Sequence, residues 1–268
     1  MTRLTGTILD EIVTYKRIDL ACQKEQQPLE RVTADARVAA PAKDFTAALR
    51  APGISLIAEI KRASPSSGEL RGDLQPAALA QTYVDNGAAA CSVLTDTRFF
   101  QGQMADLESV RQAVATPVLR KDFIIDSYQL YEARASGADA VLLIVAILDD
   151  DALSGLQALA HDLGMAALVE VHNRQELDRA LATHARIIGV NNRNLHTFDV
   201  DLKTTGSLRP YVPEGVVLVT ESGIHTPGDV ARLRDIGVDA MLVGTALVTA
   251  ADTATVVRQL VQAGRLSL

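Results

Sequence analysis

The chain has 268 residues, of which 48% are hydrophobic and only 4% aromatic, so it can bury one large core. Its net charge of −7 at pH 7 and its pI near 5.3 argue against nucleic acid or an anionic membrane surface as a partner. The first ten residues lack the apolar core of a secretory signal, no apolar run is long enough to span a membrane, and Cys22 and Cys91 lie far apart, so we expect a cytoplasmic protein without a disulfide framework.

Residues 1–50 come before the first strand-like segment and have a helical pattern. Apolar residues recur with helical spacing from Ile8 to Val13, and Pro28 and Pro41 interrupt the rest of this region. We predict an N-terminal extension of two or three helices over residues 1–50. It should pack on the rest of the chain without forming a domain of its own.

Short apolar segments come next, each ending in a polar residue or a glycine. They occupy residues 55–59, 89–94, 116–121, 138–143, 166–170, 186–191, 216–221 and 239–244. The segments recur about every 26 residues, which leaves room for a loop, a helix and another loop between them. Because they alternate little between apolar and polar residues, they are typical of parallel strands that are covered on both faces.

The stretches between these segments carry the start and stop signals of helices. Thr226 and Pro227 fit an N-cap followed by proline at the first helical position, and glycines at 87, 137, 164 and 237 end helices. Eight strand–helix units predict a (β/α)₈ TIM barrel of the α/β class, forming a single domain over residues 1–268. A doubly wound open sheet is the main alternative, but no GxGxxG follows the first strand.

The first segment runs into AEIKRASPSSG (58–68), where three charges close an apolar strand and SPSSG is unsuited to helix or sheet. In a barrel, the loops after the strands share one mouth, where the chemistry takes place. One charge at a strand end is usually a structural ion pair, but many at one end cost desolvation without structural gain. The polar and ionisable residues at the strand ends are Glu59, Lys61, Lys121, Glu170, Asn191, Arg193, Glu221 and Ser222. We therefore predict an active site there, with lysine and glutamate as the acid–base groups.

Glycines and small hydroxyls follow the last two segments. Gly223 comes after the seventh segment, and Gly244 and Thr245 follow the eighth, which is the usual place for a phosphate site in a barrel. Glycine lets a phosphate approach the backbone N–H groups, and the start of a helix would add its dipole. The basic residues expected to attract the phosphate to an acidic protein are Lys61, Arg62, Lys121 and Arg193.

The five histidines do not have the spacing of metal ligands, and no Cys/His arrangement suggests zinc. His172 and His225 lie just beyond strand ends, but lysine and glutamate remain the favoured acid–base groups. The chain also lacks a nucleophile elbow and a P-loop. We expect no metal and no cofactor.

Several stretches of the chain form a distinctive set. They are AEIKRASPSSG, SVLTDTRFFQG, PVLRKDFIID, ADAVLLIVAIL, ALVEVH, GVNNRNLHTF, TESGI and MLVGTAL, and their most specific motifs are KRxSPS, LRKDFI and NNRNL. Together they resemble the indole-3-glycerol phosphate synthase family, and the resemblance runs from about Ile8 to Leu247.

The resemblance implies an enzyme of tryptophan biosynthesis, a carboxy-lyase. It would convert 1-(2-carboxyphenylamino)-1-deoxyribulose 5-phosphate into indole-3-glycerol phosphate, carbon dioxide and water without a cofactor. The family pattern makes Lys121 the donor of a proton to the carbonyl oxygen, while Lys61 binds anions and assists dehydration. Glu59 and Glu170 would share the base and electrostatic roles, and either could be the final base. Burial and the neighbouring lysine should lower the pKa of Lys121, while the two glutamates oppose this.

The resemblance also implies the substrate contacts. Asn191 and Ser222 complete the catalytic set. The anthranilate part and its carboxylate would be held by Asn191, Arg193 and Ser64, and its ring by Phe100, Phe123 and Leu142. The ribulose hydroxyls would face Glu221 and Ser222, and the phosphate would lie at Gly223, Gly244 and Thr245.

Two departures from the family pattern and two rival functions bear on this prediction. Ser67 stands where the family commonly has lysine, and Thr245 where it has serine, so we expect altered affinity at most.

Phosphoribosylanthranilate isomerase, another barrel enzyme, would need no N-terminal extension and no KRxSPS. A metabolite-binding barrel without catalysis should have lost one of the proton-transfer residues, and none is missing. We expect a monomer or weak homodimer that acts on a small molecule.

Overall fold

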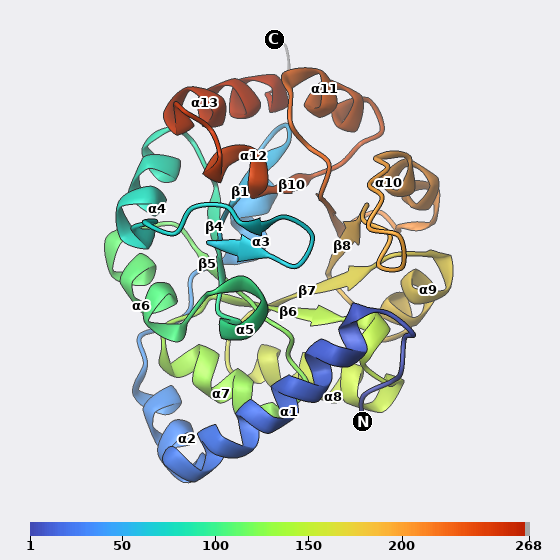
Figure 1. Cartoon of the computed structure of the whole chain (residues 1–268). Helices are drawn as coiled ribbons and strands as arrows, with labels where there is room; N and C mark the ends of the chain where they lie inside the picture. Colours follow the sequence, from blue (N-terminus) through green and yellow to red (C-terminus); the bar gives the residue numbers. More distant parts are fainter. Residues whose placement is uncertain (266–268) are drawn as a thin grey trace.

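The apolar segments form eight parallel strands in the computed structural model, which describes residues 1–265. The strands are β1 (Ser55–Ile60), β4 (Ala90–Leu94), β5 (Val118–Lys121), β6 (Ala140–Ile144), β7 (Ala166–Val171), β8 (Ile187–Asn191), β9 (Val217–Glu221) and β10 (Ala240–Val243). Each strand pairs with its neighbour in the chain, and β10 closes the barrel by pairing with β1 from Ser55–Ala240 to Ala58–Val243 (Figure 1). The (β/α)₈ prediction is confirmed, and the open-sheet alternative is wrong.

Helices surround the barrel (Figure 1). They are α4 (Pro76–Asp85), α6 (Met104–Ala113), α7 (Ser127–Ala135), α8 (Asp150–Asp162), α9 (Arg174–Ala182), α10 (Lys203–Leu208), α11 (Pro227–Asp235) and α13 (Thr253–Gly264). Short helices α5 (Thr97–Phe100) and α12 (Thr245–Val248) lie in the loops after β4 and β10, and 3₁₀ turns η1 (Val145–Ile147) and η2 (Arg209–Tyr211) follow β6 and α10. Because helices cover the strands outside and side chains fill the barrel inside, nearly every strand residue is buried.

The predicted helix boundary at Thr226 is present. The Thr226 side chain accepts a hydrogen bond from the Asp229 amide, the Asp229 side chain reciprocates, and Pro227 begins α11. Gly237, with φ of +74°, follows the end of the same helix, where residues with a side chain are strained.

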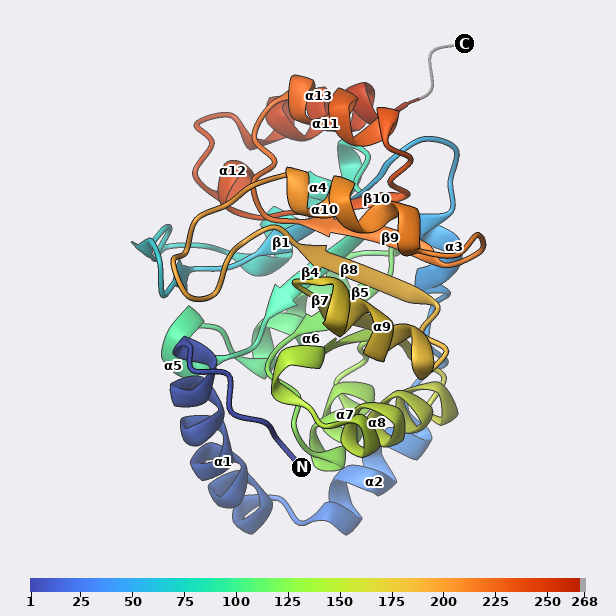
Figure 2. The same cartoon turned by 90° about the vertical axis from the view of Figure 1, so that its right-hand side faces the viewer.

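Three helices precede β1: α1 (Ile8–Gln26), α2 (Leu29–Val38) and α3 (Phe45–Leu49). Pro28 separates the first two, and Pro41 follows the second, as the sequence predicted. Helix α1 lies on the same side of the molecule as α5 (Figure 2). There the Tyr15 and Phe99 rings are 6.1 Å apart. None of the helices between residues 1 and 265 is long and apolar enough to cross a membrane.

The segment after β1 differs from the expectation. Ala63–Ser64 (β2) and Gly68–Glu69 (β3) form a short antiparallel pair, although SPSSG was judged unsuited to a sheet. The polar turn residues occupy the connection, and only two residues on each side pair through the backbone. The hairpin places residues 64–67 in the lining of the cavity at the mouth of the barrel.

Candidate active site

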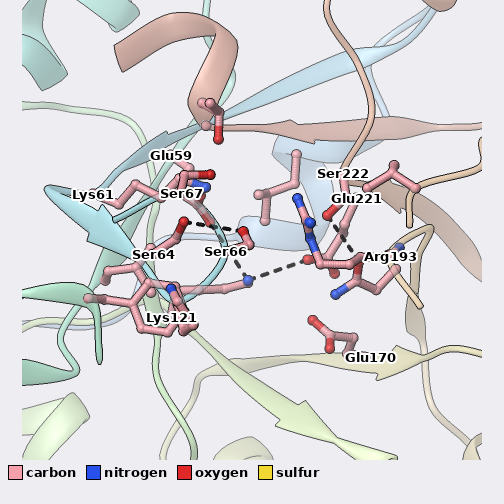
Figure 3. Close-up of a pocket in the computed structure, with 18 of the residues that line it drawn as sticks. Glu59, Lys61, Ser64, Ser66, Ser67, Lys121, Glu170, Arg193, Glu221 and Ser222 are labelled. Carbon is pink, nitrogen blue, oxygen red and sulfur yellow. Dashed lines mark hydrogen bonds and ion pairs between the residues drawn. The ribbon is translucent and has the colours of Figure 1, made fainter. Parts of the chain in front are cut away.

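A cavity of about 350 Å³ opens at the carboxyl ends of the barrel strands. Apart from Arg62, every residue that the sequence predicted for catalysis or substrate binding lines this cavity. The side chains converge from different strands because parallel strands direct their carboxyl ends to one face of a barrel (Figure 3).

Two lysines and two glutamates form the centre of the cavity. The Nζ of Lys61 is 2.7 Å from Oε1 of Glu59, and the Nζ of Lys121 is 3.6 Å from Oε2 of the same carboxylate. Lys121 also lies 3.5 Å from Oε2 of Glu221, as Figure 3 shows. The four side chains are 1% to 15% exposed, so these charges interact with little screening by water.

The surrounding carboxylates decide the charge of Lys121. Burial alone would lower its pKa, but the negative charges of Glu221, Glu59 and Glu170 raise it above the ordinary value. The sequence indicated opposing effects on this pKa, and in the structure the three carboxylates outweigh burial. Lys121 is a firmly protonated ammonium.

The carboxylate of Glu221 is buried without a hydrogen bond to either oxygen among residues 1–265. Burial, together with the charges of Glu170 and Glu59, raises its pKa to about 8 against the opposing effect of Lys121. Its position requires a glycine in β8, since a Cβ on Gly189 would overlap Oε1 of Glu221.

Two asparagines at the end of β8 support the end of β9 and the residue after it. Oδ1 of Asn191 accepts hydrogen bonds from Oγ of Ser222 at 3.0 Å and from the amide of Arg193 at 3.1 Å. Asn192, which the sequence did not select, is buried and donates through Nδ2 to the carbonyl of Glu221 at 2.9 Å. The only signal for Asn192 was its place within NNRNL.

The lining of the cavity also contains an apolar wall and a guanidinium. The rings of Phe100 and Phe123 are 6.0 Å apart, and Leu142 is buried beside them in the lining. Arg193 donates from Nη1 to the carbonyl of Phe198 at 2.9 Å and keeps other N–H groups for a ligand. This combination suits a planar aromatic group that carries a carboxylate.

Arg62 does not belong to this group of cations. Its guanidinium pairs with Asp106 and donates to the carbonyl of Gln101 at 3.2 Å. It is absent from the lining of the cavity, so the prediction that it attracts the phosphate is wrong. Ser64, two residues later in the chain, does line the cavity.

The loops after β9 and β10 carry the predicted phosphate residues. Gly223 has a φ of +83° and lies beside Val200, while Gly244 immediately precedes α12, which begins at Thr245. A Cβ on Gly244 would overlap Oε1 of Glu59 and lie 3.0 Å from Nζ of Lys61. The bare backbone of Gly244 thus makes room for the Glu59–Lys61 pair.

Over the described range 1–265, no group of three or more His, Cys, Asp or Glu side chains could hold a metal ion. Two histidines lie at the site, although the sequence ranked them below lysine and glutamate. His225 lines the cavity, and Nε2 of His172 lies 3.3 Å from Oε1 of Glu170.

Comparison with known proteins agrees with this geometry. A family model described as indole-3-glycerol phosphate synthase matches residues 9–260. An indole-3-glycerol phosphate synthase of Roseiflexus castenholzii is 56% identical over 263 residues, covering 95% of this chain and 98% of its own. A protein of the same name from Polaromonas sp. is 51% identical over 257 residues, covering 94% and 97%.

Among solved structures, the thiamine phosphate pyrophosphorylase of Pyrococcus furiosus superposes with a TM-score of 0.59 over 78% of this chain and 95% of its own. At 17% identity this likeness shows the fold alone. The family model matches residues 9–260, and the two relatives are 56% and 51% identical over nearly their whole length, so these matches show the family as well as the fold. The chain belongs to the indole-3-glycerol phosphate synthase family.

Proposed function

We propose that the protein catalyses the reaction for which its family is named, within the cavity at the barrel mouth. The substrate is 1-(2-carboxyphenylamino)-1-deoxyribulose 5-phosphate, and the products are indole-3-glycerol phosphate, carbon dioxide and water. The observation that carries this proposal is the cluster of Lys61 and Lys121 around Glu59, in one cavity with an apolar wall and Arg193. The cluster supplies acids and bases, and the wall and guanidinium match the carboxyphenyl group.

Lys121 acts as the general acid for ring closure. The ring carbon that bears the carboxylate attacks the ketone carbon, and the ammonium of Lys121 gives a proton to the carbonyl oxygen. Carbon dioxide then leaves, and its bonding electrons restore the benzene ring. The raised pKa of Lys121 keeps the donor protonated before each turnover.

Dehydration needs an acid for the departing hydroxyl and a base for a ring proton. Lys61 assists the hydroxyl as it leaves as water, and Glu59 and Glu170 are the carboxylates available to accept the proton. Nearby cations keep both carboxylates ionised. The pKa of Glu59 is lowered by Lys61 and Lys121 against the effect of burial, and that of Glu170 is lowered to about 2.

The remaining lining residues bind the substrate in this proposal. The carboxylate lies on Arg193 with Asn191 and Ser64, and the ring packs on Phe100, Phe123 and Leu142. The ribulose hydroxyls face Glu221 and Ser222, and the phosphate lies at Gly223, Gly244 and Thr245. No metal or cofactor takes part.

The same proposal treats residues 1–268 as one barrel domain, with residues 1–50 as an extension packed on it. Supporting this, Lys16 of α1 makes ion pairs of 2.7 and 2.8 Å with Asp96 and Asp122 of the barrel loops. We also propose a cytoplasmic monomer or weak homodimer, in keeping with the acidic pI and the reduced cysteines.

The proposal is tested by incubating the purified protein with the carboxyphenylamino sugar phosphate. Indole fluorescence should rise and carbon dioxide should be released in equal amounts. A parallel sample with phosphoribosylanthranilate tests the isomerase alternative. A folded protein that forms no indole product, or that isomerises phosphoribosylanthranilate instead, would overturn the proposal.

A further inference from the structure

The imidazole of His172 lies between two carboxylates, directly after β7. Its Nε2 is 3.3 Å from Oε1 of Glu170, and its Nδ1 is 3.0 Å from Oε2 of Glu176 in the first turn of α9. The same Glu176 oxygen accepts from the His172 amide at 2.8 Å, and its other oxygen accepts from Nδ2 of Asn173 at 2.8 Å. Glu176 is thus held at both oxygens, and it orients the ring toward Glu170.

This arrangement favours a charged ring. Nδ1 makes a hydrogen bond to Glu176, whereas Nε2 lies 3.3 Å from Glu170, at ion-pair distance but without a hydrogen bond to any residue within 1–265. Because a neutral imidazole carries no net charge, only the imidazolium is attracted to both carboxylates. Consistent with this, burial alone would lower the pKa of His172, but its interactions with Glu170 and Glu176 raise it to about 10. The side chain is 11% exposed and does not line the active-site cavity, so His172 acts through Glu170.

A purely structural role for the His172 ring would not account for its contact with Glu170. Helix α9 is already tied to the end of β6 by Arg179, which donates to the carbonyls of Val145 at 3.0 Å and Leu148 at 2.6 Å. The Nε2 atom of His172 lies against the carboxylate of Glu170, which lines the active-site cavity. Holding α9 against β7 would not require the contact between His172 and Glu170.

We propose that His172, oriented by Glu176, is a positioning residue of the reaction, which fixes the direction of the Glu170 carboxylate and keeps it ionised. This inference rests on the proposed function, in which Glu170 accepts or stabilises a proton. On the active-site side, the charged groups near the pair are Lys121 and Glu221. The charged and titratable residues along the neighbouring cavity that His172 and Glu176 line are Arg3, Arg179, Arg193, His196, Asp199 and Asp201.

The pH dependence of His172→Gln tests the inference. Glutamine keeps a polar side chain of similar size but carries no charge, so burial raises the pKa of Glu170. Since a base must be unprotonated, activity should then be lost as the pH falls. We expect the part of the acidic limb of kcat/KM that Glu170 governs to move up by about one pH unit or more, so that the activity of the variant relative to wild type falls as the pH is lowered and is near wild type at pH 9.

Two further variants sharpen the test. Glu176→Gln keeps a side-chain oxygen for the helix cap but removes the charge that holds the imidazolium, so it should shift the profile in the same direction by less. His161→Gln, on the exposed face of α8, is the matched control and should leave the profile unchanged. An unaltered pH profile in His172→Gln would overturn the inference. So would a rate loss equal at every pH together with a lower Tm.

A readout that needs no turnover separates this inference from the proposed function. Carboxyl NMR of protein labelled with ¹³C-glutamate, assigned with Glu170→Gln, follows the titration of Glu170 directly. His172→Gln should raise the Glu170 pKa whether or not the protein makes indole-3-glycerol phosphate. If the pKa rises while no product forms even in the wild type, the proposed function fails and the structural linkage stands; an unmoved pKa overturns the inference.

Discussion

Lys121 shows how single residues set the chemistry of the site. Its ammonium lies 3.6 Å from Glu59 and 3.5 Å from Glu221, which come from different strands, and it is 15% exposed. In such a dry setting each charge is strongly felt by its neighbours. Replacing one of these residues therefore alters the protonation of the others as well as removing its own role.

Lys121→Met should lower kcat by about a hundredfold or more, the usual contribution of a general acid. KM should change less than kcat, because the substrate carboxylate and phosphate are held elsewhere. Steady-state kinetics measure both, with Lys203→Met at the exposed start of α10 as control. Near-normal turnover in folded Lys121→Met would exclude it as the acid.

Arg193→Lys should raise KM by about tenfold or more, because an ammonium cannot reproduce a planar two-point contact with a carboxylate. Lysine would also have to replace the donation to the Phe198 carbonyl. The shape of the pH profile should be retained. Arg174→Lys, which alters a surface pair with Asp178, serves as control. An unchanged KM would place the carboxylate elsewhere, for example at Lys61.

Gly244→Val should reduce both phosphate-ester affinity and kcat. The added side chain blocks the approach of the phosphate to the backbone, and its Cβ displaces the carboxylate of Glu59 and the Nζ of Lys61. Both neighbours are ends of side chains beside an open cavity, so Tm should change little. Gly155→Ala in α8, where a Cβ meets nothing within 4 Å, is the control. Calorimetric binding at wild-type strength would contradict the phosphate site.

At the scale of elements, the loops after β8 and β9 are built as one unit. Asn192 donates to Oγ1 of Thr220 and to the carbonyl of Glu221, both at 2.9 Å, and accepts from the Thr205 hydroxyl at 2.8 Å. These bonds hold the turn in which Ser222 adopts a φ of +69°, unusual for a residue with a side chain. In this conformation Oγ of Ser222 donates a hydrogen bond to Oδ1 of Asn191.

Asn192→Ala should therefore lower the free energy of unfolding by about 2–4 kcal/mol, since several buried polar groups lose their partners. Urea unfolding followed by circular dichroism measures the loss. Asn194→Ala, in the exposed part of the same loop, provides the comparison. Equal stability of the two variants would mean that the buried network contributes nothing.

The loops after β9 and β10 give an element-scale test of the phosphate site. A crystal grown in sulfate should contain a tetrahedral anion between Gly223 and Gly244, within hydrogen-bond distance of backbone N–H groups. An anion bound only at another strand pair would mean that the substrate lies differently in the cavity.

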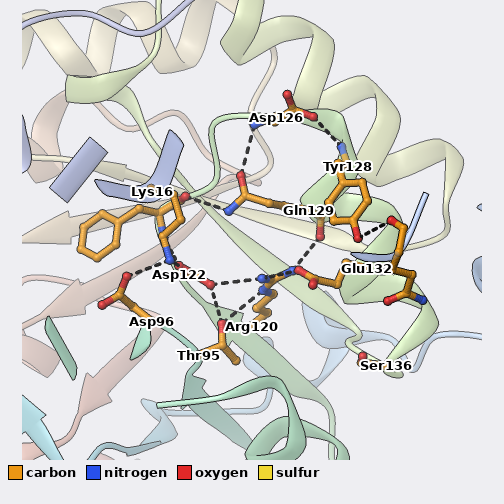
Figure 4. Close-up of polar contacts among 12 residues, drawn as sticks. Lys16, Thr95, Asp96, Arg120, Asp122, Asp126, Tyr128, Gln129, Glu132 and Ser136 are labelled. Atoms are coloured by element: carbon orange, nitrogen blue, oxygen red, sulfur yellow. Dashed lines mark hydrogen bonds and ion pairs between the residues drawn. The ribbon is translucent and has the colours of Figure 1, made fainter. Parts of the chain in front are cut away.

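At the scale of the whole molecule, buried charges join the N-terminal extension to the barrel. Lys16 of α1 lies between Asp96 and Asp122, and Asp122 also contacts Arg120 at 3.1 Å (Figure 4). Arg120 continues the chain of charges to Glu132 of α7 at 2.7 Å. The cations Lys16 and Arg120 lower the pKa of Asp122 against the effect of burial.

Lys16→Met should destabilise the protein by about 3–5 kcal/mol at pH 7, because two buried carboxylates lose their partner. The folded-state pKa of Asp122 lies below its unfolded value, so its ion pairs stabilise the fold above that unfolded value, near pH 4, and the contribution fades as the pH falls further. The difference between variant and wild type should thus shrink toward pH 3. Urea unfolding across pH 3–7 measures it, and a difference independent of pH would contradict this account.

The sequence alone was sufficient to predict the barrel, helix boundaries such as that at Thr226, and the residues that meet at the barrel mouth. Apolar segments of strand length and signals such as Thr226–Pro227 are local, and parallel strands necessarily bring their carboxyl ends to one face. The partners of each charge were decided by the tertiary structure. Arg62 faces Asp106, His172 meets Glu170, and Gly189 makes room for Glu221. The pKa of Lys121 likewise depends on distances to three other strands, because an electrostatic energy sums over neighbours in space, which spacing along the chain does not specify.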